Sequence, residues 1–119
     1  DVNNIQYIND TYGYEQGDLQ IQAAANVLIK LQLDNTDIMR TDGTEFLVYF
    51  VGYKEKQIAS FIRKLNKEFK KLPYDYGVIM AYSTINDDIK LIEDAINEAT
   101  QEIREKKNKK ESEIDEEKI

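Results

Sequence analysis

The sequence predicts an α+β domain, an α/β sandwich in which helices pack against a mainly antiparallel sheet. Apolar residues recur at helical spacing in several segments, and a β-rich run follows an Asp-Gly pair in the manner of a hairpin. The resulting order is helix, helix, hairpin, helix, strand, helix. With 119 residues and 41% hydrophobic content, the chain suits one compact domain with a modest core.

Composition excludes several classes of function. The formal net charge of −7 argues against a grip on a nucleic acid polymer, which would need a basic face. A nucleotide remains compatible, because a bound cation and backbone N–H groups can hold its phosphates. The absence of cysteine and histidine excludes disulfides, thiol nucleophiles, Cys/His zinc sites and histidine general bases. No apolar run approaches a membrane span, so we expect a cytoplasmic domain without membrane contact of its own, whatever spans a longer parent protein carries.

The chain begins with two predicted helices. The pattern over residues 5–12 predicts a helix closed by Gly13 as its C-cap. It follows residues 1–4 so abruptly that we expect an N-terminal part of the fold to be missing. Gly17 and Asp18 predict the start of the second helix, with Asp18 as its N-cap. Its apolar face is Ile21, Ala24, Ala25, Leu28 and Leu31.

The hairpin is the most informative stretch. Residues 34–37 form a polar turn, Ile38 and Met39 enter a strand, and residues 45–50 leave as a β-rich strand. Asp42 and Gly43 between them tolerate positive φ, which predicts a tight turn. Such rigid tips bind phosphates or metals, and they also serve as mere connections.

The C-terminal half predicts a long helix, a buried strand and a last helix. The long helix is stopped by Pro73, the strand covers residues 77–82, and Asn86 or Asp87 caps the last helix. The long helix carries the stripe Ile58, Phe61, Ile62, Leu65, Phe69 and Leu72, and the last helix carries Ile89, Ile92, Ile96, Ala99 and Ile103. The last stripe suits core packing, or a helical connector or dimer seam.

Taken together, these residues resemble the GGDEF domain of diguanylate cyclases. The resemblance rests on Asp1-Val2-Asn3, Ile8-Asn9-Asp10-Thr11-Tyr12-Gly13, Gly17-Asp18 and Arg40-x-x-Gly43-x-Glu45-Phe46. It covers residues 1–108 and leaves 109–119 as a charged tail or linker. It implies a fold like the palm of nucleotide polymerases and nucleotidyl cyclases, whose opening helix and most of whose first strand would precede Asp1. Family members condense two GTP molecules into cyclic di-GMP between two facing domains that hold metal ions.

The resemblance also implies a metal site. By position, Asp1 is a metal carboxylate and the Val2 carbonyl a backbone ligand for Mg²⁺, which prefers oxygen donors. The third signature position, a second carboxylate in the family, is Thr44 here, a degenerate metal ligand. Glu45 keeps the following acid as the remaining catalytic residue.

Substrate contacts follow in the same way. Asn9 and Asp18 match the positions that hydrogen-bond the guanine edge, and Gly43 keeps the second signature glycine as a substrate contact. Asp42 replaces the first glycine, which in the family lets the backbone approach phosphate closely, and adds bulk and negative charge. Near the C-terminus, Lys107 falls at the phosphate-contacting arginine.

At further family positions the expected residues are missing. Ile103 falls at the phosphate-contacting lysine, and the family's inhibitory R-x-x-D site would fall on Leu33 and Thr36.

We therefore predict a degenerate GGDEF domain of a bacterial cyclic di-GMP signalling protein. It would have little or no cyclase activity, bind GTP, and be joined to other domains such as an EAL-type cyclic di-GMP phosphodiesterase. One alternative is an active cyclase in which Asp42 supplies the lost carboxylate. Another is a dimerisation module that binds no nucleotide. Without the resemblance, Asp18 would be read as a helix cap and Glu45 as a strand residue facing Arg40.

Overall fold

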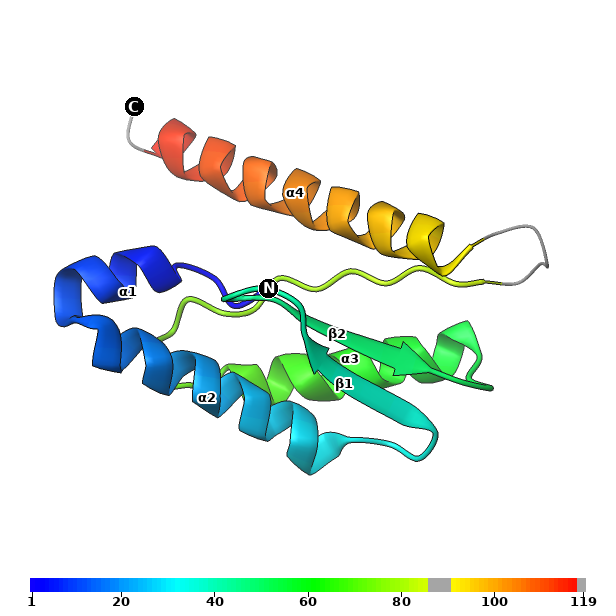
Figure 1. Cartoon of the computed structure of the whole chain (residues 1–119). Coiled ribbons are helices and arrows are strands. Elements are labelled where there is room, and N and C mark those ends of the chain that lie inside the picture. The colour runs from blue at the N-terminus through cyan, green and yellow to red at the C-terminus, as the bar shows by residue number, and fades with distance from the viewer. Residues whose placement is uncertain (86–90, 118–119) are drawn as a thin grey trace. The chain divides into compact units, whose positions relative to one another are not determined.

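The computed structural model describes residues 1–85 and 91–117 and shows the α+β fold expected from the sequence (Figure 1). The chain forms two compact units, Asp1–Val78 and Ile79–Ile119. The first unit holds three helices and an antiparallel hairpin, and the second holds an extended segment and one long helix. The predicted domain boundary at residue 108 stays a prediction.

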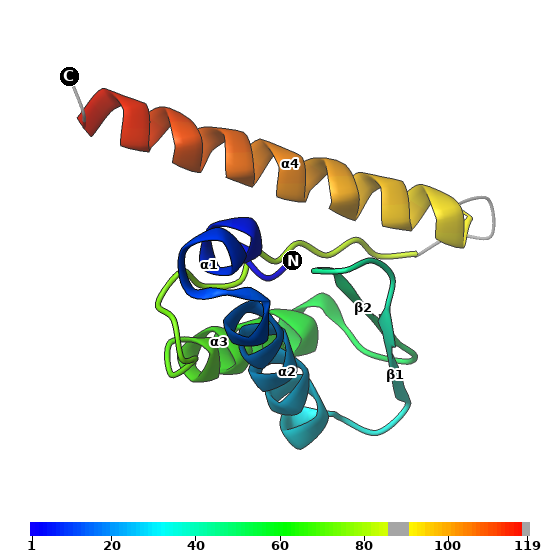
Figure 2. The same ribbon diagram turned by 60° about the vertical axis from the view of Figure 1, so that its left-hand side comes forward.

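Helices α1 (Ile5–Tyr12) and α2 (Tyr14–Leu31) meet at Gly13 (Figure 2). Gly13 has φ 97° and its N–H donates to the Asn9 carbonyl at 3.0 Å, which confirms it as the C-cap of α1. Its own carbonyl accepts from the N–H of Gln16 at 3.1 Å. The same glycine therefore ends α1 and starts α2. The prediction that α2 begins with Asp18 as N-cap was wrong, because the helix already starts at Tyr14.

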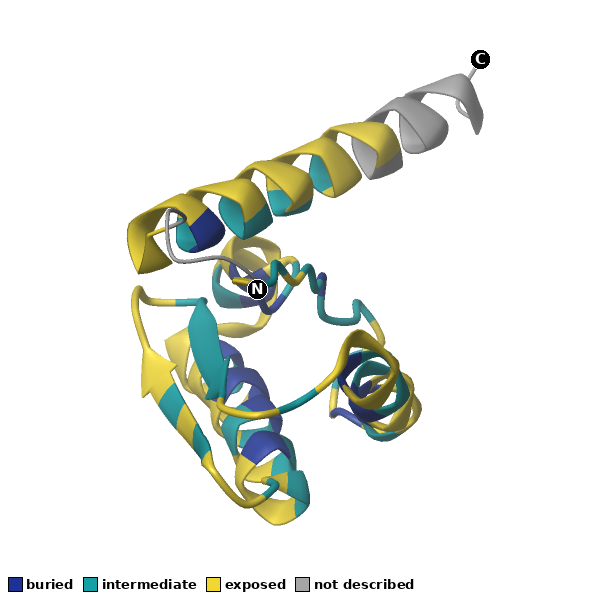
Figure 3. Ribbon diagram, turned by 90° about the vertical axis from the view of Figure 1, so that its right-hand side faces the viewer, coloured by how far each residue is buried: buried dark blue, intermediate teal, exposed yellow. Residues whose placement is uncertain are grey.

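The core of the first unit lies between α2 and α3 (Glu55–Phe69), whose buried residues lie on facing sides (Figure 3). The amphipathic stripes predicted which face of each helix is buried. The prediction that Pro73 stops the long helix was wrong, since α3 ends at Phe69. Leu72 is buried beyond the helix, in a turn where its N–H donates to the Phe69 carbonyl at 3.4 Å. The buried apolar residues of α2 and α3 are Ile21, Ala24, Leu28, Ile58, Phe61, Leu65 and Phe69.

The hairpin pairs β1 (Thr36–Arg40) with β2 (Phe46–Phe50) in antiparallel register, as predicted. The rings of Phe50 and Phe61 stand edge to face at 5.4 Å and attach the hairpin to α3. The predicted tight turn at Asp42 and Gly43 was wrong: a five-residue loop, 41–45, joins the strands, and neither of the two residues has positive φ.

The predicted strand over residues 77–82 reduces to one isolated bridge, in which Val78 pairs antiparallel with Val2. The ladder is this short because the neighbouring segment turns into α1 at Ile5. A strand needs a partner along its whole length to complete its hydrogen bonds, and here the partner covers about one residue pair. The prediction of a full strand was therefore wrong.

A buried glutamine anchors the loop before this bridge. Gln20 has no exposed surface, its Nε2 donates to the Tyr74 carbonyl at 2.8 Å, and its Oε1 accepts from the Tyr74 N–H at 3.0 Å. The carboxamide thus pairs with both backbone groups of one residue, as a neighbouring strand would. The Tyr74 hydroxyl also donates to Gln16 Oε1 at 2.9 Å.

In the second unit, the segment from Ile79 to Ile85 is tied to α4 (Ile92–Glu117). Lys106 Nζ donates to the Met80 carbonyl at 2.6 Å, and Ser83 donates to Glu98. The proposed caps Asn86 and Asp87, with Ile89 of the predicted stripe, lie outside the described residues. Among the helices described, none combines the length and the apolar character that crossing a membrane requires.

Candidate functional site

The structure brings together the two side chains that the sequence assigned to a metal. Thr44 Oγ1 donates to Asp1 Oδ1 at 2.9 Å, and the Val2 N–H donates to the Thr44 carbonyl at 2.9 Å. Asp1 is only 9% exposed. A buried carboxylate needs a donor or a cation, and the hydroxyl of Thr44 supplies one such donor.

The segment that carries these residues is held from its other side as well. The Asn3 N–H donates to the Gly77 carbonyl at 3.1 Å, and Asn3 Nδ2 donates to the Tyr76 carbonyl at 3.2 Å. Residues 1–3 therefore lie between the end of the hairpin loop and the segment 76–78. This arrangement fixes the position of the Asp1 carboxylate through backbone bonds.

The tip of the hairpin is closed by its own polar groups. Asp42 Oδ1 accepts from the Gly43 N–H at 2.7 Å, and Arg40 Nη2 donates to the Gly43 carbonyl at 2.6 Å. Space is open around Gly43, where an added Cβ would meet nothing within 4 Å. The backbone donor that a phosphate could use is thus engaged by a carboxylate. Glu45, half-buried, follows the tip, and its N–H donates to the Asp42 carbonyl at 3.3 Å.

The donor set at Asp1 and Thr44 does not fit a pair of Mg²⁺ ions. It offers one carboxylate, one neutral hydroxyl and the backbone of Val2, whereas Mg²⁺ needs near-octahedral oxygen ligands and favours carboxylates. Within residues 1–85 and 91–117, no group of three or more acidic residues is arranged to hold a metal ion.

The predicted guanine contacts lie at the corner between α1 and α2. Asn9 is half-buried on α1 and Asp18 is exposed on α2. Asn9 Oδ1 is buried and has no hydrogen-bond partner among the described residues. It lies against Gly17, where an ideal Cβ would be 1.7 Å from Oδ1. The site therefore contains an unpaired acceptor beside a glycine, with an exposed carboxylate next along the helix.

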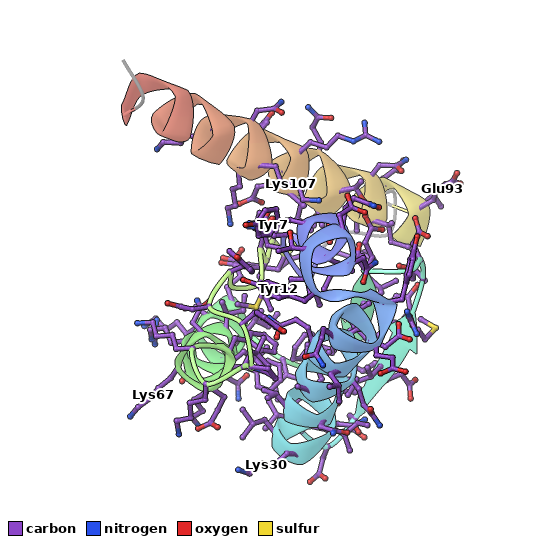
Figure 4. The ribbon with its side chains drawn as sticks, turned by 90° about the vertical axis from the view of Figure 1, so that its left-hand side faces the viewer. Tyr7, Tyr12, Lys30, Lys67, Glu93 and Lys107 are labelled. Carbon is purple, nitrogen blue, oxygen red and sulfur yellow. The ribbon has the colours of Figure 1, made fainter. Side chains whose placement is uncertain are left out.

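Tyrosines border this corner. Tyr7 and Tyr12 project from α1 (Figure 4), and each packs against a tyrosine of the loop after α3, with ring centroids 5.7 Å apart for Tyr7 and Tyr76 and 5.1 Å for Tyr12 and Tyr74. Burial, followed by the neighbouring Tyr7 and Tyr12, raises the pKa of Tyr76. These rings keep the loop and α1 in contact.

Lys107, the predicted phosphate contact, lies on α4 in the second unit (Figure 4). Its neighbour Lys106 is committed to the Met80 carbonyl and to Glu102, whose Oε1 lies 3.5 Å from Lys106 Nζ. The phosphate role of Lys107 stays a prediction.

Sequence reasoning missed two residues of this region. Gln20 lies in the apolar stripe of α2, one residue before Ile21, and a polar residue in that register was the available signal. Gly17 was interpreted as a helix start, although it lies inside α2. A glycine inside a helix normally has a packing reason, and this was the signal that could have identified it.

Comparison with protein families agrees with the motifs. A family model described as diguanylate cyclase, GGDEF domain, matches residues 1–113. A search of curated proteins found no match. The family match spans nearly the whole chain, including the Asp1 segment, the α1–α2 corner and the hairpin. This protein chain belongs to the GGDEF domain family of diguanylate cyclases.

Proposed function

We propose that this GGDEF domain binds GTP as a regulatory module and makes little or no cyclic di-GMP. The observation that carries the proposal is the hydrogen bond from Thr44 Oγ1 to Asp1 Oδ1 at 2.9 Å. A neutral hydroxyl stands where the family has a carboxylate, so the metal site has lost one of its charges.

The chemistry of the family makes this loss costly. Joining two GTP molecules requires cations that neutralise triphosphate charge and activate a 3′-hydroxyl. Removing one charged group at such a site costs about 10²- to 10³-fold in rate, and several losses compound. Glu45 retains an acid beside the tip, but one acid does not replace two.

The hairpin tip supports the same proposal. The Gly43 N–H donates to Asp42 Oδ1 at 2.7 Å, so a phosphate would have to displace a carboxylate from its own backbone donor. A carboxylate at this position also repels an approaching phosphate. Both effects weaken the phosphate side of the site.

The two residues that match the family's guanine contacts, Asn9 and Asp18, are both present. A carboxylate at Asp18 can accept hydrogen bonds from N1–H and the 2-amino group of guanine together, which adenine does not offer. The exposure of Asp18 on α2 supports a site that a base can reach. The substrate contacts in this proposal are Asn9, Asp18, Gly43 and Lys107, with a weak Mg²⁺ site at Asp1, Val2 and Thr44.

As a regulatory module, the domain would act in the cytoplasm within a longer cyclic di-GMP signalling protein. An EAL-type phosphodiesterase is the partner domain we propose. Two copies would pair through their GGDEF faces or through α4. The net charge of −7 disfavours any role with a nucleic acid polymer.

The test is calorimetric titration of the chain with GTP, with and without Mg²⁺, using ATP as the control. We expect micromolar GTP binding that ATP does not reproduce and that depends little on Mg²⁺. Cyclic di-GMP production that Asp42→Ala abolishes would favour the active variant instead. An absence of heat with every nucleotide would leave only the dimerisation module.

A further inference from the structure

Gly17 lies inside α2, where the backbone does not require glycine. Its φ is not positive, and glycine destabilises a helix interior relative to alanine. The residue is also buried. A glycine that weakens its own helix needs a reason in its surroundings.

The space where a Cβ of residue 17 would lie is occupied by the carboxamide of Asn9. An ideal Cβ at Gly17 would lie 1.7 Å from Asn9 Oδ1, 2.8 Å from Asn9 Cγ and 3.4 Å from Asn9 Nδ2, and these are the three nearest heavy atoms. The first distance is far inside any van der Waals contact. Any side chain at position 17 must therefore displace the carboxamide of Asn9.

The contact also orients the carboxamide. The Oδ1 end lies against Gly17 and is buried without a partner among the described residues, while the Nδ2 end lies farther from the glycine. An amide held this way leaves its Nδ2 donor for a ligand and keeps its Oδ1 acceptor buried. Gly13 keeps the two helices in this relation, because it accepts from the Gly17 N–H at 3.4 Å and donates to the Asn9 carbonyl at 3.0 Å.

We propose that Gly17 positions Asn9 so that its amide presents a hydrogen-bond donor to the base, which makes Gly17 a specificity-determining residue. A donor at this place suits the O6 and N7 acceptors of guanine and opposes the 6-amino group of adenine. The inference rests on the proposed guanine pocket for its ligand, but the positioning of Asn9 by Gly17 can be tested without any ligand.

The ligand-free test is a double-mutant cycle on the full chain, with Tm as the measurement. Gly17→Ala should lower the Tm by about 4 °C or more, because the methyl group collides with Asn9. In an Asn9→Ala background the same substitution should raise the Tm by about 3 °C, because alanine favours the helix once the collision is gone. An equal loss in both backgrounds would overturn the proposal.

The ligand test compares GTP, ITP and ATP binding by the native and Gly17→Ala chains. The substitution should lower the preference for GTP over ATP about tenfold, the loss of one hydrogen bond. It should leave the ratio of GTP affinity to ITP affinity unchanged, because the 2-amino group that ITP lacks would be bound by Asp18 and not by Asn9. An unchanged GTP-to-ATP ratio would overturn the specificity role. Equal binding of the three nucleotides by the native chain would instead overturn the guanine pocket, while the sign change in Tm would still establish the positioning.

Discussion

The hairpin tip and the α1–α2 corner differ in how their polar groups are satisfied. At the tip, Thr44 donates to Asp1, and Asp42 accepts from Gly43. At the corner, Asn9 Oδ1 is buried without a partner among the described residues and Asp18 is exposed. A group bonded within the protein must give up that bond to meet a ligand, whereas an exposed carboxylate such as Asp18 gives up only water. The polar groups of the tip are thus already bonded within the protein, and the carboxylate of the corner is open to solvent.

The largest effect should come from restoring the family's residues at the hairpin tip. Asp42→Gly with Thr44→Asp returns the first glycine and the second carboxylate, and we expect cyclic di-GMP formation to rise about 10²-fold, as measured by chromatography of the product. The matched control is Asp42→Gly with Thr44→Asn, which has the same shape without the charge. Equal rates in the two double variants would sink the idea that the missing carboxylate limits the reaction.

A smaller effect should follow from removing the carboxylate at the corner between α1 and α2. Asp18→Ala removes a charged acceptor, so GTP affinity should fall about 10- to 100-fold in calorimetry. Glu15→Ala is the control, since it removes the same charge from an exposed position on the same helix. A similar fall in both variants would point to net charge in place of a specific contact.

The smallest effect concerns the tip without substrate. Thr44→Asp alone places a second carboxylate beside Asp1, where like charges repel, and the free energy of unfolding should drop by about 1–2 kcal/mol at neutral pH. Millimolar Mg²⁺ should recover this loss in a thermal melt, because the two acids then share a cation. Thr44→Asn again serves as the control and should not respond to Mg²⁺.

The sequence predicted the elements that depend on local pattern. Gly13 as a cap, the stripes of α2 and α3, and the two strands of the hairpin all follow from residue spacing and turn chemistry. The motif positions of the site followed from the family resemblance, and the family match confirms the family.

The features that the sequence did not predict depend on partners distant along the chain. Val78 has a single bridge because its neighbour Val2 leads directly into α1. Gln20 is buried because the backbone of Tyr74 receives it, and no window around Gln20 contains that information. The start of α2 was missed because Gly13 serves two helices at once, which a rule for one helix end does not foresee.

The pairing of Gln20 with Tyr74 has a consequence for how the molecule moves. The loop after α3 forms no strand ladder, yet both backbone groups of Tyr74 are bonded to Gln20 of α2, and three residues later the Gly77 carbonyl accepts from the Asn3 N–H. A displacement of α2 would therefore act on residues 74–77, whose other end is bonded to Asn3. This short stretch joins the helix that carries Asp18 to the segment that carries Asp1.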